Sequence, residues 1–313
     1  MKIFEITYPH SLLREELPET AAAIGFFDGV HKGHQKLINT AISESSKNQL
    51  ESAVITFHPH PSVVLKKDKQ HVQYITPLHV KKKILQQMNI DRLYIITFNE
   101  QLASLSPKEF ISHFIDGLNI KHIIGGFDYT FGHKGKGNMD LMKKQAGNRL
   151  EVTTIDKVEM DNEKVSSTKI REFMNAGKIE KVNTLLNRPL ATTGTVVKGD
   201  QRGRTIGFPT ANLEINQDTL MPKPGVYAVK ALYKNEAYEG MANLGVKPTF
   251  TTGEKIPTLE VHLLDYNNDI YGEELVIEWY QYIRDEVKFN GIDELVNQLK
   301  KDEQQTRQYF SDK

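Results

Sequence analysis

The stretch Ala21-Ala-Ala-Ile-Gly-Phe-Phe-Asp-Gly-Val-His-Lys-Gly-His34 decides the fold of the first half of the chain. Its first part, Ala21 to Phe27, carries no charged side chain, which is typical of a strand buried on both faces of a parallel sheet. Beyond the stretch, apolar residues recur with the spacing of one helical face. These positions, with His34, are Leu37, Ile38, Ala41 and Ile42. We therefore predict a buried strand, a tight turn and a helix.

Three more apolar runs predict further strands of the same kind: Ala53–Phe57, Leu93–Thr97 and His122–Gly125. Between the last two, Ser106-Pro-Lys-Glu109 has the form of a capping box with proline at the first helical position. Alternating strands and helices are typical of an α/β fold with a parallel, Rossmann-like sheet. Ligands of such sheets bind beyond the carboxyl ends of the strands. The run Lys81-Lys-Lys83 lies in one helical stretch and predicts a solvated face.

The pattern changes near Asn187-Arg-Pro-Leu190, after which short period-two segments alternate with glycine and proline. These segments are Gly194–Lys198, Gly225–Lys230, Thr258–Leu263 and Leu275–Tyr280. Their spacing predicts a small antiparallel β-barrel, and Ile292–Phe310 predicts a helix that closes it. We place one domain at residues 1–186 and a second at residues 187–313.

Composition bounds the class of protein. The chain has 313 residues, a length that usually divides into two domains. Its 40 basic and 40 acidic residues cancel, which argues against a dedicated nucleic-acid-binding protein, because such proteins neutralise phosphates with cationic side chains. The absence of cysteine excludes disulfides and thiolate chemistry. No secretory signal is visible in the segment MKIFEITYPHSLLREELPE, and no apolar run reaches membrane-spanning length. We expect a soluble protein of the cytoplasm.

The turn after the first buried strand contains residues that are typical of a phosphate-binding site. Gly29 and Gly33 allow a tight turn and a close approach of the backbone to a ligand. Free N–H groups at a helix start attract phosphate, and His31 and His34 add side-chain donors. A zinc site is the alternative at this point. Its ligands would be Asp28, His31, His34, His58 and His60.

Two other segments of the first half fit a nucleotide site. Phe57-His-Pro-His-Pro61 follows the second predicted strand and therefore lies at the same edge of the sheet. Ser166-Ser-Thr-Lys-Ile-Arg171 has the form of another helix start, with Ser167 or Thr168 as the cap. Hydroxyls, backbone N–H groups and Arg171 would all face phosphate there.

The second half contains its own phosphate-binding pattern, Gly199-Asp-Gln-Arg-Gly-Arg-Thr-Ile-Gly-Phe-Pro-Thr-Ala-Asn212. It combines permissive glycines with two arginines, a hydroxyl and an amide, but lacks the ending of a P-loop. Further on, Leu259 and Val261 alternate with Glu260, which predicts that Glu260 lies on the outer face of its strand. A carboxylate there is suited to act as a general base toward a hydroxyl.

Together these motifs resemble one family. In order, G-x-F-D-G-V-H-x-G-H, T-F-x-P-H-P and S-S-T-x-I-R resemble the adenylyltransferase module of bacterial bifunctional riboflavin kinase/FAD synthetases, of the HxGH nucleotidyltransferase superfamily. Ile124–Gly132 and the following His133-Lys-Gly-Lys-Gly137 resemble its flavin-side loop. The motifs G-D-x-R-G-R-x-x-G-F-P-T-A-N, P-G-V-Y-A, N-L-G-V-K-P-T-F and L-E-V-H-L-L-D resemble the riboflavin kinase module. Phe26 departs from the family, which often has asparagine there.

The resemblance implies roles for particular residues. In the first module, His31 and His34 would be catalytic, and ATP would contact Gly25, Phe27, Asp28, Gly33, Ser167, Thr168 and Arg171. Flavin would contact His58, Pro59, His60, Pro61, Asp128 and Phe131. In the second module, ATP or flavin would contact Gly199, Arg202, Gly203, Arg204, Gly207, Phe208, Pro209 and Asn243. Thr210 and Asn212 would hold Mg²⁺, and Glu260 would be the catalytic base.

The resemblance therefore implies two reactions with ATP: phosphorylation of riboflavin to FMN and adenylylation of FMN to FAD. We expect ATP, Mg²⁺ and flavins as ligands, no nucleic-acid or membrane partner, and a monomer or weak homo-oligomer. One alternative is another HxGH adenylyltransferase, in which the second module would have no role. The other alternative is a regulatory protein that binds flavin or RNA. The presence of two complete phosphate-site motifs argues against it.

Overall fold

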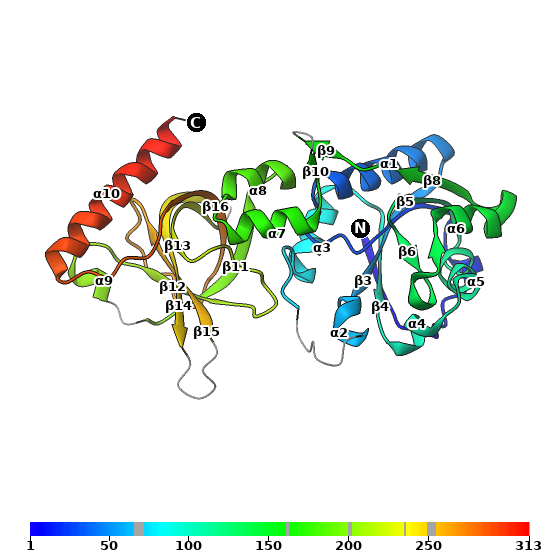
Figure 1. Ribbon diagram of the computed structural model, residues 1–313, viewed down its shortest axis with the longest axis horizontal. Coiled ribbons are helices and arrows are strands. Elements are labelled where there is room, and N and C mark those ends of the chain that lie inside the picture. The colour runs from blue at the N-terminus through cyan, green and yellow to red at the C-terminus, as the bar shows by residue number, and fades with distance from the viewer. Residues whose placement is uncertain (66–71, 161–162, 200–201, 235, 249–254, 313) are drawn as a thin grey trace. The chain divides into compact units, whose positions relative to one another are not determined.

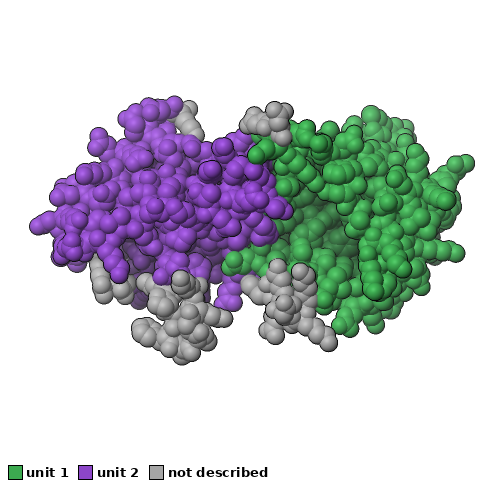
Figure 2. Space-filling model, in the orientation of Figure 1, with its two compact units in different colours: residues 1–167 green, residues 168–313 purple. Residues whose placement is uncertain are grey.

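The computed structural model describes residues 1–65, 72–160, 163–199, 202–234, 236–248 and 255–312. The chain packs as two compact units, Met1–Ser167 and Thr168–Lys313, coloured separately in Figure 2. Two helices precede the barrel strands, α7 (Ser167–Asn175) and α8 (Ile179–Leu186). By packing, nearly all of α7 and the whole of α8 belong to the second unit. The domain bounds of 1–186 and 187–313 stay a prediction.

The first unit is built on a sheet of six parallel strands, in the order β1-β4-β3-β2-β5-β8. The strands are β1 (Lys2–Ile6), β2 (Thr20–Ile24), β3 (Glu51–His58), β4 (Arg92–Thr97), β5 (Ile120–Gly126) and β8 (Glu151–Ile155). Three of them, β3, β4 and β5, contain the apolar runs predicted as strands, and β2 covers the predicted run from Ala21 only as far as Ile24. The prediction of a parallel α/β unit is confirmed (Figure 1).

Helices cover both faces of this sheet, because alternate residues of each strand point to opposite sides. One face packs on α1 (Lys32–Asn48) and α3 (Leu78–Gln87), through side chains such as Ile38 and Leu85. The other face packs on four helical segments. They are α4 (Glu100–Ser104), α5 (Pro107–Phe110), a π-helical turn (Ile111–Asp116) and α6 (Met139–Ala146). Burial on both faces explains the continuous apolarity of the strands.

Short elements complete the first unit. They are η1 (Arg14–Glu16), α2 (Pro61–Leu65), β6 (Thr130–Phe131), η3 (His133–Gly135), β7 (Gly137–Asn138), η4 (Gly147–Arg149), β9 (Glu159–Met160) and β10 (Glu163–Lys164). The capping box predicted before α5 is present: Ser106 N donates to Glu109 Oε2 at 2.8 Å, and Glu109 N donates to Ser106 Oγ at 3.3 Å.

The second unit is a closed antiparallel barrel in the order β11-β12-β15-β14-β13-β16, as predicted (Figure 1). Its strands are β11 (Leu190–Val197), β12 (Ala211–Ile215), β13 (Gly225–Tyr233), β14 (Glu236–Pro248), β15 (Lys255–Leu263) and β16 (Glu274–Arg284). The short α9 (Arg202–Thr205) lies between β11 and β12. Along β15, Leu259 and Val261 are buried inside the barrel while Glu260 is half-buried on the outside.

The predicted closing helix is α10 (Ile292–Ser311), the last helix of the chain in Figure 1. It packs on β13 and β14 and is tied to the barrel by an ion pair. Arg284 Nη2 lies 2.7 Å from Asp302 Oδ2, and the Asp302 side chain is 1% exposed. Among the helices of the described residues, none has the length and apolarity needed to cross a membrane.

Candidate active sites

The loop after β2 lies at the position in the sheet where the order of the strands reverses. Strand β2 pairs with β3 on one side and with β5 on the other, so the connections from these strands diverge. Such a switch point is where ligands bind to open parallel sheets. The loop is held in an unusual backbone shape, with positive φ at Phe27 (55°), Gly29 (91°) and Val30 (42°). Phe27 and Val30 are fully buried, so packing holds this shape before any ligand binds.

Two histidines stand together at the start of α1. His31 is the N-cap of the helix, and its Nδ1 accepts the N–H of His34 at 3.3 Å. The two rings stack with centroids 3.6 Å apart. A side chain at Gly33 would place Cβ 3.2 Å from the His31 ring, so glycine leaves room for this stack. Because Nδ1 of His31 is an acceptor, its Nε2 carries the proton in the neutral form and remains a donor.

His34 has the clearest open hydrogen-bonding group of the loop. Its Nδ1 is buried and has no hydrogen-bond partner within the described part of the chain, while the Phe27 ring meets the His34 ring edge-on. Burial holds the pKa of His34 well below its ordinary value of 6.5, and the charges of His31 and Lys81 lower it further. A buried polar atom without a partner is costly, and an incoming phosphate oxygen would satisfy it.

Lys81 corrects the prediction of a solvated lysine face on α3. Its side chain is 3% exposed, and its Nζ donates to the main-chain oxygen of Phe26 at 2.7 Å. Lys82 pairs with Glu5 at 2.9 Å, and Lys83 is exposed as predicted. The amphipathic pattern of α3 predicted that all three lysines are exposed. Lys81 is buried because its Nζ binds the carbonyl oxygen of Phe26, a contact that forms only in the folded protein.

The segment after β3 packs against the same loop, as predicted from its place at the sheet edge. The His60 ring meets the Phe26 ring edge-on with centroids 4.6 Å apart, and Thr56 Oγ1 donates to the Phe26 oxygen at 3.0 Å. His58 is the last residue of β3 and Pro61 the first of α2, with Pro59 between them.

Two further hydrogen bonds connect Asp28 of the loop to other segments. The Asp28 carboxylate accepts the N–H of Thr76 at 3.0 Å, and a side chain at Gly25 would lie 3.0 Å from the Phe27 ring. The hydroxyl of Ser167 donates to the Asp28 main-chain oxygen at 2.8 Å. Ser167 is the first residue of α7, so it lies inside the helix instead of capping it. Thr168 and Arg171 lie on the same helix, on the side of the boundary assigned to the second unit.

The predicted flavin-side loop follows β5, the neighbour of β2. Asp128 is exposed and pairs with Lys164 at 2.6 Å, and Lys164 also lies 4.7 Å from the centre of the exposed Phe127 ring. Phe131 instead is buried against Phe110, with ring centroids 5.1 Å apart. The structure therefore gives Phe131 a packing role, and a flavin contact of its ring stays a prediction.

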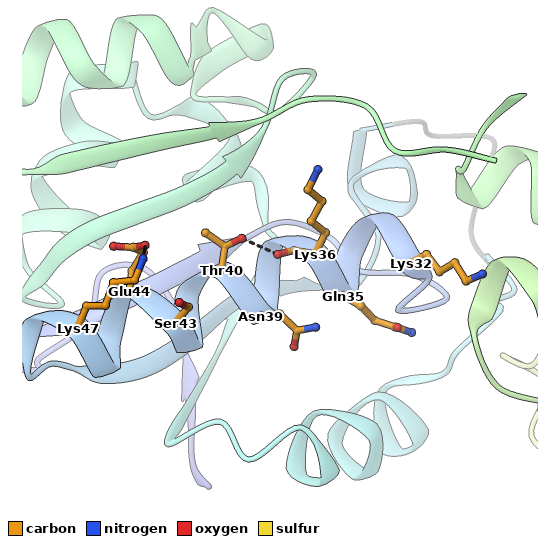
Figure 3. Close-up of a pocket in the computed structure, with 8 residues that line it drawn as sticks. All are labelled: Lys32, Gln35, Lys36, Asn39, Thr40, Ser43, Glu44 and Lys47. Atoms are coloured by element: carbon orange, nitrogen blue, oxygen red, sulfur yellow. Dashed lines mark hydrogen bonds and ion pairs between the residues drawn. The ribbon is translucent and has the colours of Figure 1, made fainter. Parts of the chain in front are cut away.

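The outer face of α1 carries a shallow groove, shown in Figure 3. Its lining side chains are all polar, and among them are Lys32, Gln35, Lys36 and Asn39. Ligand sites for cofactors are mainly apolar with a few polar groups. The groove therefore lacks the lining that is typical of a cofactor site. The zinc alternative also loses support, because the described residues contain no group of three or more potential ligands placed to hold a metal ion.

The barrel brings three polar residues from distant parts of the sequence into one row. Asn212 on β12 lies opposite Glu260 on β15, and Asn243 on β14 lies opposite the same glutamate. Residues directly opposite each other in antiparallel strands carry side chains on the same face, with Cβ atoms about 4.5–5.5 Å apart. Glu260 therefore stands between two amides on the outside of the barrel, and Asn243 Nδ2 also donates to Glu286 Oε1 at 3.5 Å.

The glycine-rich loop leaves room for this row. A side chain at Gly199 would place Cβ 2.2 Å from Asn212 Nδ2, and one at Gly203 would place it 2.1 Å from the Phe208 oxygen. Phe208 is buried and packs near the His262 ring, whose Nδ1 lies 2.7 Å from the Pro209 oxygen. Gly207 has a φ of 82°, which favours glycine. Asp200 and Gln201 lie outside the described residues, as does the side chain of Arg202.

A pocket opens beside Thr210, the residue before β12. Arg204, Pro209, Tyr266 and Tyr271 are among its lining residues. It combines aromatic rings, a cationic side chain and a hydroxyl, which are the groups that recognise a nucleotide. Thr210 precedes Asn212 by two residues in the chain, but no residue of the Asn212–Glu260–Asn243 row is among those that line the pocket.

Comparison with known proteins identifies a family for each half of the chain. The FAD synthetase family matches residues 13–169, and the riboflavin kinase family matches residues 186–310. The chain is 47% identical over 312 residues to a bifunctional riboflavin kinase/FMN adenylyltransferase of Bacillus subtilis (strain 168), and the match covers 99% of each chain. Proteins of the same description from Listeria monocytogenes and Escherichia coli (strain K12) are 46% and 34% identical. These matches cover 92% and 96% of this chain and the same shares of the relatives.

A solved structure has the same fold over nearly the whole length. It is described as a macrolide-efflux protein from Streptococcus pneumoniae, with a TM-score of 0.89 and 36% sequence identity. The match covers 98% of this chain and 99% of that one.

Proposed function

The chain belongs to the family of bifunctional riboflavin kinases/FMN adenylyltransferases, and we propose how its two units divide the two reactions. The enzyme phosphorylates riboflavin to FMN with ATP. It then joins FMN to the AMP part of a second ATP, which gives FAD and pyrophosphate. We assign phosphorylation to the barrel unit and adenylylation to the α/β unit, so that each uses its own phosphate-binding loop.

The Asn212–Glu260–Asn243 row is the observation that supports the kinase assignment. The 5′-hydroxyl of the ribityl chain attacks the γ-phosphorus of ATP, and its proton passes to the carboxylate of Glu260. The bond between the γ-phosphorus and the bridging oxygen breaks, and ADP leaves. Phosphoryl transfer needs mainly positioning and charge stabilisation. The two amides beside Glu260 serve this by orienting the carboxylate and the phosphates.

The residues next to Glu260 fit a magnesium ion. Thr210 and Asn212 offer a hydroxyl and an amide oxygen, which are hard oxygen donors of the kind that Mg²⁺ binds together with phosphates and water. Gly199 leaves space for the Asn212 side chain, since any Cβ there would occupy its place. When bound, Mg²⁺ would offset negative charge on the ATP phosphates. We place the adenine ring in the pocket beside Thr210, between Tyr266 and Tyr271.

In the α/β unit, the stacked pair of His31 and His34 supports the adenylylation assignment. A phosphate oxygen of FMN attacks the α-phosphorus of ATP, and the bond from this phosphorus to pyrophosphate breaks. The Nε2–H of His31 and the unpartnered Nδ1 of His34 are donors for the charge that develops. The N–H groups at the start of α1 add to them. Since no side chain replaces a bond to phosphorus in this scheme, no covalent enzyme intermediate forms.

The remaining ligand contacts stay predictions of this proposal. For adenylylation, ATP contacts are assigned to Gly25, Phe27, Asp28, Gly33, Ser167, Thr168 and Arg171, and flavin contacts to His58, Pro59, His60, Pro61, Asp128 and Phe131. In the barrel unit, ligand contacts are assigned to Gly199, Arg202, Gly203, Arg204, Gly207, Phe208, Pro209 and Asn243. We also propose that the enzyme works in the cytoplasm, where ATP is available, as a monomer or weak homo-oligomer without a nucleic-acid or membrane partner.

The test is to incubate the protein with riboflavin, ATP and Mg²⁺ and to separate the flavins by chromatography. We expect FMN to appear first and FAD after it. Supplying FMN in place of riboflavin should give FAD directly, with one pyrophosphate released for each FAD formed. Failure to form either product from a folded protein would show that the proposal is wrong.

A further inference from the structure

Lys81 is a buried cation that no carboxylate contacts directly among the described residues, although the charge of Asp28 acts on it from nearby. Its Nζ donates to the main-chain oxygen of Phe26 at 2.7 Å, lies 3.4 Å from Thr56 Oγ1 and sits 4.8 Å from the centre of the Phe26 ring. Among the described residues, no aspartate or glutamate forms an ion pair with it. Burying an ammonium ion in this way is costly unless an opposite charge compensates it. A site that binds polyphosphate supplies such a charge.

The contacts of Lys81 lead directly to the nucleotide loop. Phe26 immediately precedes the strained turn at Phe27, so Lys81 and Thr56 hold the carbonyl group at the base of that turn. The charge of Lys81 also helps to lower the pKa of His34, after burial and the charge of His31. Lys81 on α3 and His34 on α1 therefore act on the same small volume from two different helices.

We propose that Lys81 is a positioning residue for adenylyl transfer, which holds the Phe26 carbonyl at the base of the nucleotide loop and whose buried charge strengthens the binding of ATP phosphates there. This inference rests on the assignment of adenylyl transfer to the α/β unit. Lys81 acts through the loop and through its electric field. It touches neither the reacting atoms nor the histidine donors.

The proposal predicts a particular pH dependence. Burial lowers the pKa of Lys81 to about 8, although the nearby charge of Asp28 opposes this shift. The other groups that act on or with Lys81 are the neutral hydroxyl of Thr56 on β3 and His34 on α1, whose own pKa His31 also lowers. Above pH 8 the ammonium charge is lost, so ATP binding by this unit weakens. One pH unit above the pKa, about one-tenth of Lys81 remains charged, which limits the loss of affinity to roughly ten-fold.

The experiment measures KM for ATP in the conversion of supplied FMN to FAD, over a pH series from about 6.5 to 9.5 that brackets the Lys81 pKa. The variants are Lys81→Met, Lys81→Arg and, as the matched control, Lys82→Met. Lys82 is the next residue on α3 and has its own partner, Glu5. FMN formation from riboflavin by each variant reports on the barrel unit and serves as an internal reference.

We expect KM for ATP to rise above pH 8 in the wild type and in Lys82→Met. In Lys81→Met it should already be raised at neutral pH, by at least the factor that the wild type shows at the alkaline end of the series, and then stay constant, because the charge is absent at every pH. Lys81→Arg should restore tight binding without the alkaline rise, since a guanidinium stays charged over this range. NMR titration of the imidazole should show a higher His34 pKa in Lys81→Met than in the wild type. A purely structural lysine would not produce these opposite pH profiles.

Three results would overturn the proposal. They are an unchanged alkaline rise in Lys81→Met, a rise in Lys81→Arg that matches the wild type, and the same KM change in Lys82→Met as in Lys81→Met. If Lys81→Met does not fold, the pH profile of KM for ATP in Lys81→Arg tests the proposal by itself, because that variant keeps the positive charge. Failure of the wild type to make FAD at all would instead count against the assignment of the reaction, and is read from the same assay.

Discussion

Gly199→Ala tests whether the placement of Asn212 controls the kinase reaction. The new Cβ would lie 2.2 Å from Nδ2, 2.5 Å from Cγ and 2.7 Å from Oδ1 of Asn212. All three atoms belong to one side chain, so the barrel strands need not move to relieve the clash. The amide group must instead shift to reach van der Waals contact at about 3.4 Å, a displacement of more than 1 Å. The fold should therefore survive while the Asn212–Glu260–Asn243 row is disturbed.

A misplacement of about 1 Å in a positioned group typically costs on the order of 100-fold in rate, which is the loss we expect for FMN formation from riboflavin. Adenylylation of supplied FMN by the same variant should be unchanged, since that reaction is assigned to the other unit. The matched control is Gly291→Ala in the barrel unit, where a new Cβ meets no atom within 4 Å. A folded Gly199→Ala variant with wild-type FMN formation would refute the reasoning.

Three further predictions concern pH and stability. Burial holds the pKa of His34 well below 6.5, so below that pH the unfolded chain binds a proton that the folded chain does not bind. The stability of the α/β unit should therefore fall as the pH drops below 6.5. A series of thermal-unfolding measurements should show a smaller fall in His34→Gln. Arg284→Met leaves the buried Asp302 without its ion-pair partner, with Gln298 as a remaining donor, and should lower the free energy of unfolding of the barrel unit by roughly 3 kcal/mol in denaturant titration. The exposed comparison for this second prediction is Arg307→Met, which breaks the ion pairs with Asp265 and Glu303 and should lower the free energy of unfolding far less. Ser106→Ala removes half of a capping box and should cost about 1 kcal/mol by the same measurement.

The parts of the fold that depend on local sequence could be predicted. Burial on both faces leaves a continuous apolar run, which identified strands such as β3 and β4. The capping box before α5 is a contact between near neighbours, so its residues alone reveal it. In the barrel unit the period-two pattern identified β13 and β16, while β12 and β14 emerge only from strand pairing. Their sequences are too mixed to show a clear alternation.

The candidate sites show the same limit. Motifs led to His31, His34 and Glu260, but the row that joins Glu260 to two asparagines depends on register between strands far apart in the chain. Lys81 was missed because its helix has an ordinary amphipathic pattern, and its burial is explained only by the Phe26 carbonyl. A hydrogen bond between residues far apart in the chain does not change the hydrophobic periodicity of the helix, so the sequence pattern does not reveal it.

The most direct test of the division of labour compares the product profiles of two variants. With riboflavin and ATP, His31→Ala should accumulate FMN and form no FAD. Glu260→Gln should form neither product from riboflavin but convert supplied FMN to FAD at the wild-type rate. These profiles would show that the two reactions use separate sites on separate units. If either folded variant lost both activities, the assignment of one reaction to each unit would be contradicted.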